Sequence, residues 1–146
     1  MRVDPPAATV GELLSRLGAE SAASFSRRVS ALGLSPAQVA VLRAVAEKPG
    51  GSQQALAAHL GAVPSRIVAL LDDLTEARLV ERRRSPADRR LNELHLTASG
   101  RRRLRDLDRV TVEHDEALCD GLDAAERAHL QRLLSRLVEL RAGQRR

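Results

Sequence analysis

The sequence predicts a mainly helical protein that carries one small β-hairpin. Apolar residues make up 43% of the 146 residues but aromatic residues only 1%, so Leu, Ala and Val must build the core, a composition that favours helices. Helix-capping pairs recur before stretches with apolar residues at helical spacing. One stretch alternates apolar and polar residues around a turn. At this length we expect a single domain over residues 1–146.

Capping boxes mark the starts of three helices. The pairs are Thr9 with Glu12, Ser35 with Gln38, and Asp123 with Glu126. In each pair the first side chain caps the amide three residues later, and the Glu or Gln side chain caps in return. They predict a helix over about 9–31 that Gly33 stops, a second helix from Pro36, and a last helix that follows the break at Gly121.

The middle of the chain has the pattern of a helix-turn-helix. Pro49, Gly50 and Gly51 end the second helix, and Ser52 can cap a short third helix that reaches Gly61. Three residues later Pro64 opens a further helix over residues 64–77. Two helices joined by a tight turn with glycine form the unit whose second helix enters the major groove of DNA.

A hairpin rich in arginine follows. The run VERRR leads into the turn SPAD, and LNELHL leads out, with Leu91, Leu94 and Leu96 facing inward by an imperfect alternation. Residues 78–105 hold ten Arg against three acidic residues, a charge of +7 where the whole chain carries +5. Such a patch is typical of a nucleic-acid partner, and a tip of guanidinium groups can reach a minor groove or its phosphates.

The helices at the two ends predict a homodimer. Segment 9–33 and segment 98–142, which Thr97 opens, carry apolar stripes, whereas residues 34–97 form a compact DNA-binding lobe able to bury its own helices. The stripes therefore need another partner, and a second copy of the chain is the simplest one. Dimers also suit helix-turn-helix proteins, which read paired half-sites about 34 to 36 Å apart.

Residues 34–104 resemble the winged-helix core of the MarR family, the multiple-antibiotic-resistance regulators. The resemblance rests on LSPAQ, LAAHLG, LVERR before the wing, DRR at 88–90, and LTASG after it. It implies a ligand-responsive homodimeric transcription regulator, a repressor, that binds pseudo-palindromic double-stranded DNA through recognition helix 64–77 and the wing. It also implies that Arg90 enters the groove, that Asp88 shapes the wing through an ion pair, and that a small-molecule effector binds between the dimerisation helices and the lobe.

The residues that match this pattern are the candidate site. The DNA-binding candidates are Ser65, Arg66, Arg82, Arg84, Asp88, Arg89 and Arg90, and the effector-pocket candidates are Phe25 and Leu17. The chain departs from the family at Val63, where a Ser or Thr cap is usual, and at Arg78, where Gly is usual. Few polar readers remain on helix 64–77, so we expect phosphate and wing contacts to dominate. The alternative is a winged-helix protein-binding module with weak or no sequence-specific DNA reading.

Other features favour no catalytic role. The sequence has no Gly-rich phosphate loop, nucleophile elbow or Ser/His/Asp grouping, so we expect no enzyme, cofactor or metal site. Cys119 is a buried thiol or a redox sensor, and His114 with His129 is a metal pair or surface. The arginines at 101–105 either bind phosphate or pack against acidic neighbours. Without a signal-like start or a run of about 20 apolar residues, we expect a cytoplasmic protein without a membrane partner.

Overall fold

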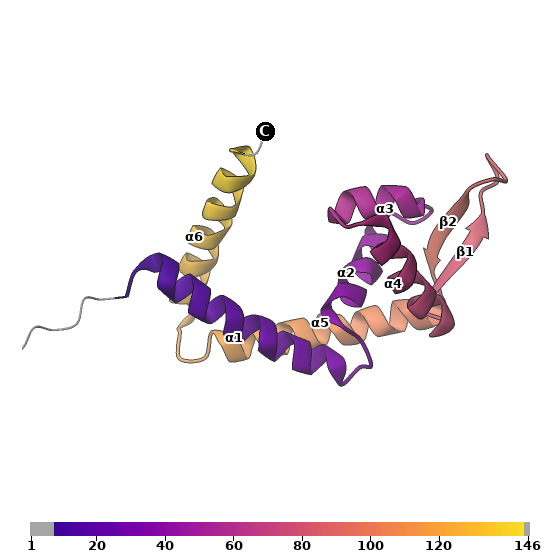
Figure 1. Ribbon diagram of the computed structural model, residues 1–146. Coiled ribbons are helices and arrows are strands. Elements are labelled where there is room, and N and C mark those ends of the chain that lie inside the picture. Colours follow the sequence, from indigo (N-terminus) through magenta and orange to yellow (C-terminus); the bar gives the residue numbers. More distant parts are fainter. Residues whose placement is uncertain (1–7, 145–146) are drawn as a thin grey trace, which may run out of the picture. The chain divides into compact units, whose positions relative to one another are not determined.

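The computed structural model describes residues 8–144 and divides the chain into two compact units at His114 and Asp115 (Figure 1). The elements are α1 (Val10–Ser30), α2 (Pro36–Glu47), α3 (Gln53–Leu60), α4 (Pro64–Glu76), β1 (Val80–Arg84), β2 (Asn92–Leu96), α5 (Ala98–Leu118) and α6 (Ala124–Gly143). The first unit holds α1 to β2 and most of α5, and the second holds the end of α5 and α6. The mainly helical fold class with one hairpin is confirmed.

The helices begin where the capping boxes predict. The side-chain oxygen of Thr9 accepts a hydrogen bond from the amide of Glu12, and the pairs at Ser35 and Asp123 repeat this geometry. Each cap satisfies amide groups that have no partner inside the first helical turn. The Thr9 bonds also hold the pKa of the Glu12 carboxyl below its ordinary value.

Helices α3 and α4 form the helix-turn-helix. Gly61 ends α3 with φ of +59°, a left-handed conformation that glycine adopts without strain, and Pro64 occupies the first turn of α4. Helix α4 ends at Glu76, one residue before the predicted end. No single helix within residues 8–144 is long and apolar enough to cross a membrane; α3 and α4 meet that test only as a joined pair bent by 115°.

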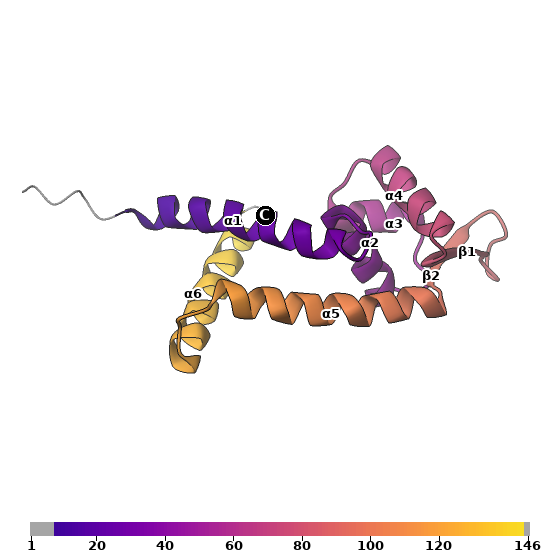
Figure 2. The same ribbon diagram turned by 90° about the horizontal axis from the view of Figure 1, so that it is seen from below.

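The hairpin is antiparallel and projects away from the helices of the first unit (Figures 1 and 2). Val80 pairs with Leu96 and Arg82 with Leu94. Leu94 and Leu96 are buried as predicted, but Leu91 is 46% exposed, so its predicted inward orientation is wrong. Leu91 lies before β2 in the wing turn, where it has no core to face. An isolated bridge pairs Gly51 with Leu94 beside this two-stranded sheet, a contact that the sequence did not reveal.

The core of the first unit gathers around α2. Its buried side chains come from α2, α3, α4, both strands and α5, together with Val29 at the end of α1. Helix α5 approaches the chain after α4 so closely that a Cβ on Gly100 would lie 2.0 Å from the carbonyl oxygen of Leu79. This approach seats α5 under the hairpin and so fixes where its arginines lie.

Helix α1 meets α5 through a small polar contact within the first unit. The hydroxyl of Ser21 lies 3.0 Å from Nε2 of His114, and the ring of Phe25 lies 5.5 Å from the His114 ring. In the second unit α6 has no buried residue, and its leucines at 130, 133, 134, 137 and 140 are exposed. Cys119 is buried, which fits the interpretation as an ordinary buried thiol.

Candidate nucleic-acid interface

The start of α4 presents the two predicted base readers to solvent. Ser65 and Arg66 are exposed, whereas Ile67, Leu71 and Leu74 are buried in the core. Val63 stands where the family usually has a Ser or Thr N-cap. As the N-cap of α4 it makes no side-chain hydrogen bond. The first amides of α4 lack a side-chain cap and carry the positive end of the helix dipole.

The outward side of α4 is short of polar readers and carries acidic residues. Val68, Ala69, Asp72 and Asp73 are exposed beyond Ser65. The carboxylate of Asp72 does not stand alone, because its Oδ1 lies 2.7 Å from a guanidinium nitrogen of Arg82 on β1. An unpaired Asp72 on the exposed side of α4 would repel phosphates. The ion pair with Arg82 offsets this repulsion.

The wing turn is held by its own backbone and by two short side chains. Ser85 donates its amide to the carbonyl of Leu91 at 2.9 Å, and its hydroxyl accepts from the amide of Ala87. Asp88 accepts the amide of Arg90 at 2.9 Å. Among the residues that the structure describes, Asp88 takes part in no ion pair, so it shapes the wing through the backbone rather than through the pairing that the resemblance implies.

The arginines of the wing divide into two groups. Arg82 pairs with Asp72, and Arg83 pairs with Glu81 on the same strand. Arg84, Arg89 and Arg90 are exposed, and no acidic partner for them occurs within residues 8–144. The tip of the wing therefore offers three guanidinium groups that remain available to an external anion.

A polar cluster supports the base of the wing. The carboxylate of Glu93 lies 3.1 Å from Nε2 of His95 and also bonds the hydroxyl of Ser85, and these contacts hold the pKa of Glu93 below its ordinary value. Ser85 is buried although it is polar. Sequence reasoning missed this cluster; the only signal was the placement of Glu93 and His95 two residues apart on one face of a strand.

Three arginines at the start of α5 donate hydrogen bonds to oxygen atoms of the chain that are not acidic. Arg101 donates to the carbonyl of Leu96 at 3.0 Å, Arg102 donates to the hydroxyl of Ser99 at 2.8 Å, and Arg103 donates to the carbonyl of Leu32. These bonds hold α5 to neighbouring chain segments. The alternative of packing against acidic neighbours is thus replaced by bonds to carbonyl and hydroxyl oxygens.

A cavity of about 440 Å³ lies in the first unit between α2, the hairpin and α5. Its polar lining consists of Arg83, His95, Arg101, Arg105 and Asp108. Its apolar lining consists of Val45, Ala46, Pro49, Leu96 and Leu104. Asp108 is 3.4 Å from Arg43, so part of its negative charge is offset by a residue outside the lining. The cavity combines an apolar floor with an excess of cationic groups.

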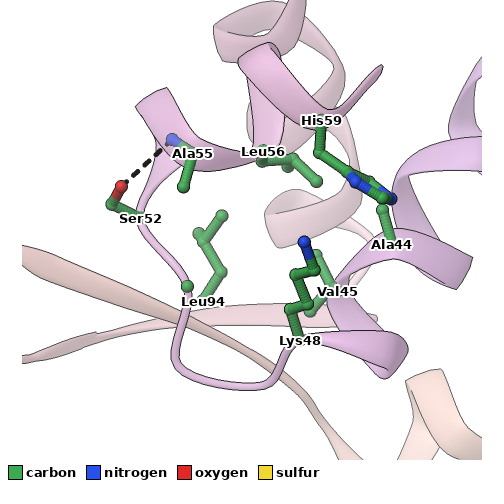
Figure 3. Close-up of a pocket in the computed structure, with 9 residues that line it drawn as sticks. Ala44, Val45, Lys48, Ser52, Ala55, Leu56, His59 and Leu94 are labelled. Carbon is green, nitrogen blue, oxygen red and sulfur yellow. Dashed lines mark hydrogen bonds between the residues drawn. The ribbon is translucent and has the colours of Figure 1, made fainter.

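A second cavity is much smaller. Figure 3 shows Val45, Leu56 and Leu94 around it, with Lys48 and His59 also in its lining. Its volume is about 30 Å³, which suits one or two water molecules and no organic ligand. It is therefore a packing defect between α2, α3 and β2 rather than a site.

The predicted effector-pocket residues lie elsewhere. Phe25 is half-buried against His114, and Leu17 is 50% exposed on α1. Neither residue lines the larger cavity. Nδ1 of His114 is buried and has no hydrogen-bond partner among residues 8–144. No group of three or more metal-binding side chains occurs in the described part of the chain.

Comparisons with known proteins agree on one family. The sequence model of the MarR family matches residues 32–91. A protein of Thauera aromatica, named for transcriptional regulation of the hcr operon, is 35% identical over 114 residues, which cover 77% of this chain and 69% of that protein. The transcriptional repressor Rv2887 of Mycobacterium tuberculosis is 31% identical over 130 residues, which cover 89% of this chain and 94% of the repressor.

Solved structures extend the similarity to complexes. The repressor CouR, bound to a 23-mer DNA duplex, is 32% identical, with a TM-score of 0.76 over 89% of this chain and 92% of that one. Rv2887 in complex with DNA is 29% identical, with a TM-score of 0.77 over 89% of this chain and 98% of that one. Rv2887 in complex with salicylic acid is 30% identical, with a TM-score of 0.73 over 90% of this chain and 98% of that one.

Proposed function

Because this chain belongs to the MarR family of transcriptional regulators, we propose that it is a ligand-responsive, homodimeric transcriptional repressor that binds pseudo-palindromic double-stranded DNA. The observation that carries the proposal is the pairing of an exposed Arg66 at the start of α4 with three uncommitted guanidinium groups at the wing tip. The repressors Rv2887 and CouR, each solved with DNA, support it.

In this proposal α4 enters the major groove and the wing contacts the minor groove. Ser65 and Arg66 meet base edges, and Arg66 can bind the O6 and N7 atoms of a guanine. Arg84, Arg89 and Arg90 bind phosphates or the minor-groove floor, while Asp88 keeps Arg90 in place through its amide. Val68 and Ala69 offer contact only to a thymine methyl group, so phosphate contacts supply most of the affinity.

A second copy of the chain completes the molecule in this proposal. The exposed leucines of α6 and the exposed Val10, Leu13, Leu14 and Leu17 of α1 form apolar surfaces too extensive to face water without a partner. A two-fold symmetric dimer would bury them and present two copies of α4 to successive major grooves. In this proposal Leu17 serves the dimer interface.

We place the effector in the larger cavity, which neither Phe25 nor Leu17 lines. A volume of about 440 Å³ is in the range of small-molecule sites. Arg101 and Arg105 can hold a carboxylate while Val45 and Leu104 contact an apolar body. The salicylic acid complex of Rv2887 supports a ligand of this kind. Binding would favour a conformation whose recognition helices no longer match adjacent grooves.

The test is selection of bound duplexes from a random DNA pool, followed by salt titration of the selected duplex against a scrambled one. We expect a two-fold symmetric site that binds much more tightly than its scramble. If no symmetric site emerges and both duplexes bind alike with the same salt dependence, sequence-specific reading fails. The protein-binding module, which the thin polar face of α4 favours, would then be the better account.

A further inference from the structure

Arg82 differs from Arg83 in the side of β1 on which it lies, and it differs from Arg84, on its own side, in having an acidic partner. Side chains alternate along a strand, so Arg82 shares a side of β1 with buried Val80, and its partner across the hairpin is buried Leu94. Its side chain is only 28% exposed. The stem of Arg82 thus extends the side of the hairpin that carries Val80 and Leu94.

The guanidinium of Arg82 is aimed at the recognition helix. Its terminal nitrogen lies 2.7 Å from Oδ1 of Asp72 on α4. Asp72 follows Ser65 by seven residues, which is two helical turns, so both lie on the outward side of α4. The ion pair therefore joins α4 and β1, the two elements that meet DNA in the proposed function.

The covalent connection between these elements is short and carries an unusual residue. Only Ala77, Arg78 and Leu79 separate α4 from β1, and Arg78 has φ of +59°, a left-handed conformation that side chains rarely adopt. Leu79 donates its amide to the carbonyl of Leu74, which anchors the base of the wing. Beyond that base, the Arg82–Asp72 pair is the polar contact that joins the wing to α4 among the described residues.

We propose that Arg82 is a positioning residue: its ion pair with Asp72 sets the angle between wing and recognition helix, so that both fit one DNA site together. The proposal rests on the proposed DNA-binding function and assigns Arg82 a different task from Arg84, Arg89 and Arg90. The pair also neutralises a carboxylate on the outward side of α4, where an unpaired negative charge would oppose phosphates.

The sign of one substitution separates positioning from phosphate contact. If Arg82 bound phosphate, Asp72→Asn would remove a negative charge, release the guanidinium, and tighten binding to every duplex. If Arg82 positions the wing, Asp72→Asn loosens the wing and lowers selectivity for the specific site even though the net charge becomes more favourable to DNA. Arg82→Ala would have the same effect on selectivity, and the two effects would not add.

The experiment measures affinity of the full chain for the selected duplex and for its scramble, in Asp72→Asn, Arg82→Ala and the double variant. Asp73→Asn is the matched control for the carboxylate, since Asp73 is an exposed neighbour without an ion pair within residues 8–144. Arg84→Ala is the comparison for the arginine: Arg84 lies on the same side of β1 without an acidic partner in the described residues, so its loss should weaken both duplexes alike and leave selectivity unchanged. We expect selectivity to fall by about two- to fivefold in each single variant and no further in the double variant.

Equal tightening of both duplexes in Asp72→Asn, with an additive loss in the double variant, would overturn the proposal. If the unsubstituted chain shows no selectivity, the proposed DNA function fails on its own, and hydrogen exchange of the DNA-free protein decides the role of Arg82. We then expect faster exchange over residues 80–84 and 92–96 in Asp72→Asn and Arg82→Ala than in the two controls. Unchanged exchange in both variants would show that the pair does not hold the wing.

Discussion

At the scale of single residues, the arginines of the wing have distinct roles although the sequence repeats them without a break. Arg83 faces the cavity and Glu81, Arg82 faces α4, and Arg84 has no acidic partner among the described residues. Arg89 and Arg90 follow the turn that Ser85 and Asp88 hold. A contact of the wing with DNA therefore depends on three of its five arginines, Arg84, Arg89 and Arg90.

Arg90→Ala should weaken binding to all duplexes and reduce the slope of log affinity against log salt by about 1, because one phosphate contact is lost. Arg66→Ala should instead relax the preference at one base position by about 1 to 3 kcal/mol and leave the slope nearly unchanged. Salt titrations on the selected duplex and its single-base variants measure both. Equal effects of the two substitutions on every duplex would remove Arg66 as a base reader.

A second prediction for a single residue concerns Arg78, which follows the end of α4. Arg78 occupies a left-handed conformation that glycine reaches without steric strain, so Arg78→Gly should raise the free energy of unfolding by about 1 kcal/mol. Arg78→Ala keeps the strain and serves as the control. The hydroxyl of Thr97 bonds the carbonyl of residue 78 and is available in both variants. Urea unfolding checks the difference; equal stability of the two variants would show that the strain is small.

At the scale of elements, the hairpin is stabilised at its base rather than at its tip. Val80, Leu94 and Leu96 are buried there, and Glu93 joins His95 to Ser85 beside them. Gly50 lies against Glu93 and His95 and donates its amide to Leu94. These contacts connect the loop after α2 with both strands and the wing turn at the base of the hairpin. The tip carries the exposed arginines.

This arrangement predicts a pH dependence of stability. His95 first, and Ser85 next, hold the pKa of Glu93 below its unfolded value. The stabilisation is therefore present above the unfolded pKa and is lost as pH falls through the lower folded pKa. Thermal unfolding is measured from about pH 7 down to about pH 3. Glu93→Gln should lose less stability over this range than the unsubstituted chain. A parallel loss in both would exclude Glu93 as the cause. Glu116→Gln, an exposed carboxylate on α5, is the control.

At the scale of the whole molecule, the proposed dimer and the proposed effector site use different features, the exposed stripe of α6 and the cavity beside α5. The leucines of α6 form a stripe without a buried member, which a single chain leaves open to water. The cavity beside α5 lies close to the hairpin, so an occupant can contact groups of both strands. The proposal therefore predicts that substitutions in α6 and substitutions in the cavity have separate effects.

Leu134→Glu should shift the protein from dimer to monomer, because it sets a charge within the apolar stripe of α6. Gln131→Glu makes the same addition of charge on the same helix at a polar position and should leave the dimer intact. Sedimentation velocity over a range of concentrations distinguishes the two variants. A dimer that persists in Leu134→Glu would mean that α6 does not form the interface.

Arg105→Gln should raise the salicylate concentration needed to release DNA by about tenfold, because it removes a charge-assisted contact in the cavity. Arg102→Gln, which changes an exposed arginine of α5 outside the cavity lining, should leave that concentration unchanged. Titration of the DNA complex with salicylate measures both variants. An equal response of Arg105→Gln and the unsubstituted chain would place an effector elsewhere, with Phe25 and His114 as the next region to test.

The sequence alone determined the helix starts, the helix-turn-helix, the hairpin and the family. These features depend on residues a few positions apart. A capping box joins two residues three positions apart, and Gly61 ends α3 through its own backbone conformation. Such signals can be read from neighbours in the chain because the partner is always at the same spacing.

Tertiary structure decided which side chains are available to a ligand. Arg82 reaches Asp72 ten residues away, Arg103 reaches the carbonyl of Leu32, and the cavity gathers side chains from α2, both strands and α5. Leu91 and Leu94 likewise differ in burial because of where the hairpin meets the core. Whether an arginine is paired within the chain or available to a ligand depends on where distant acidic groups and carbonyls lie in the fold. No local pattern of arginines encodes those positions.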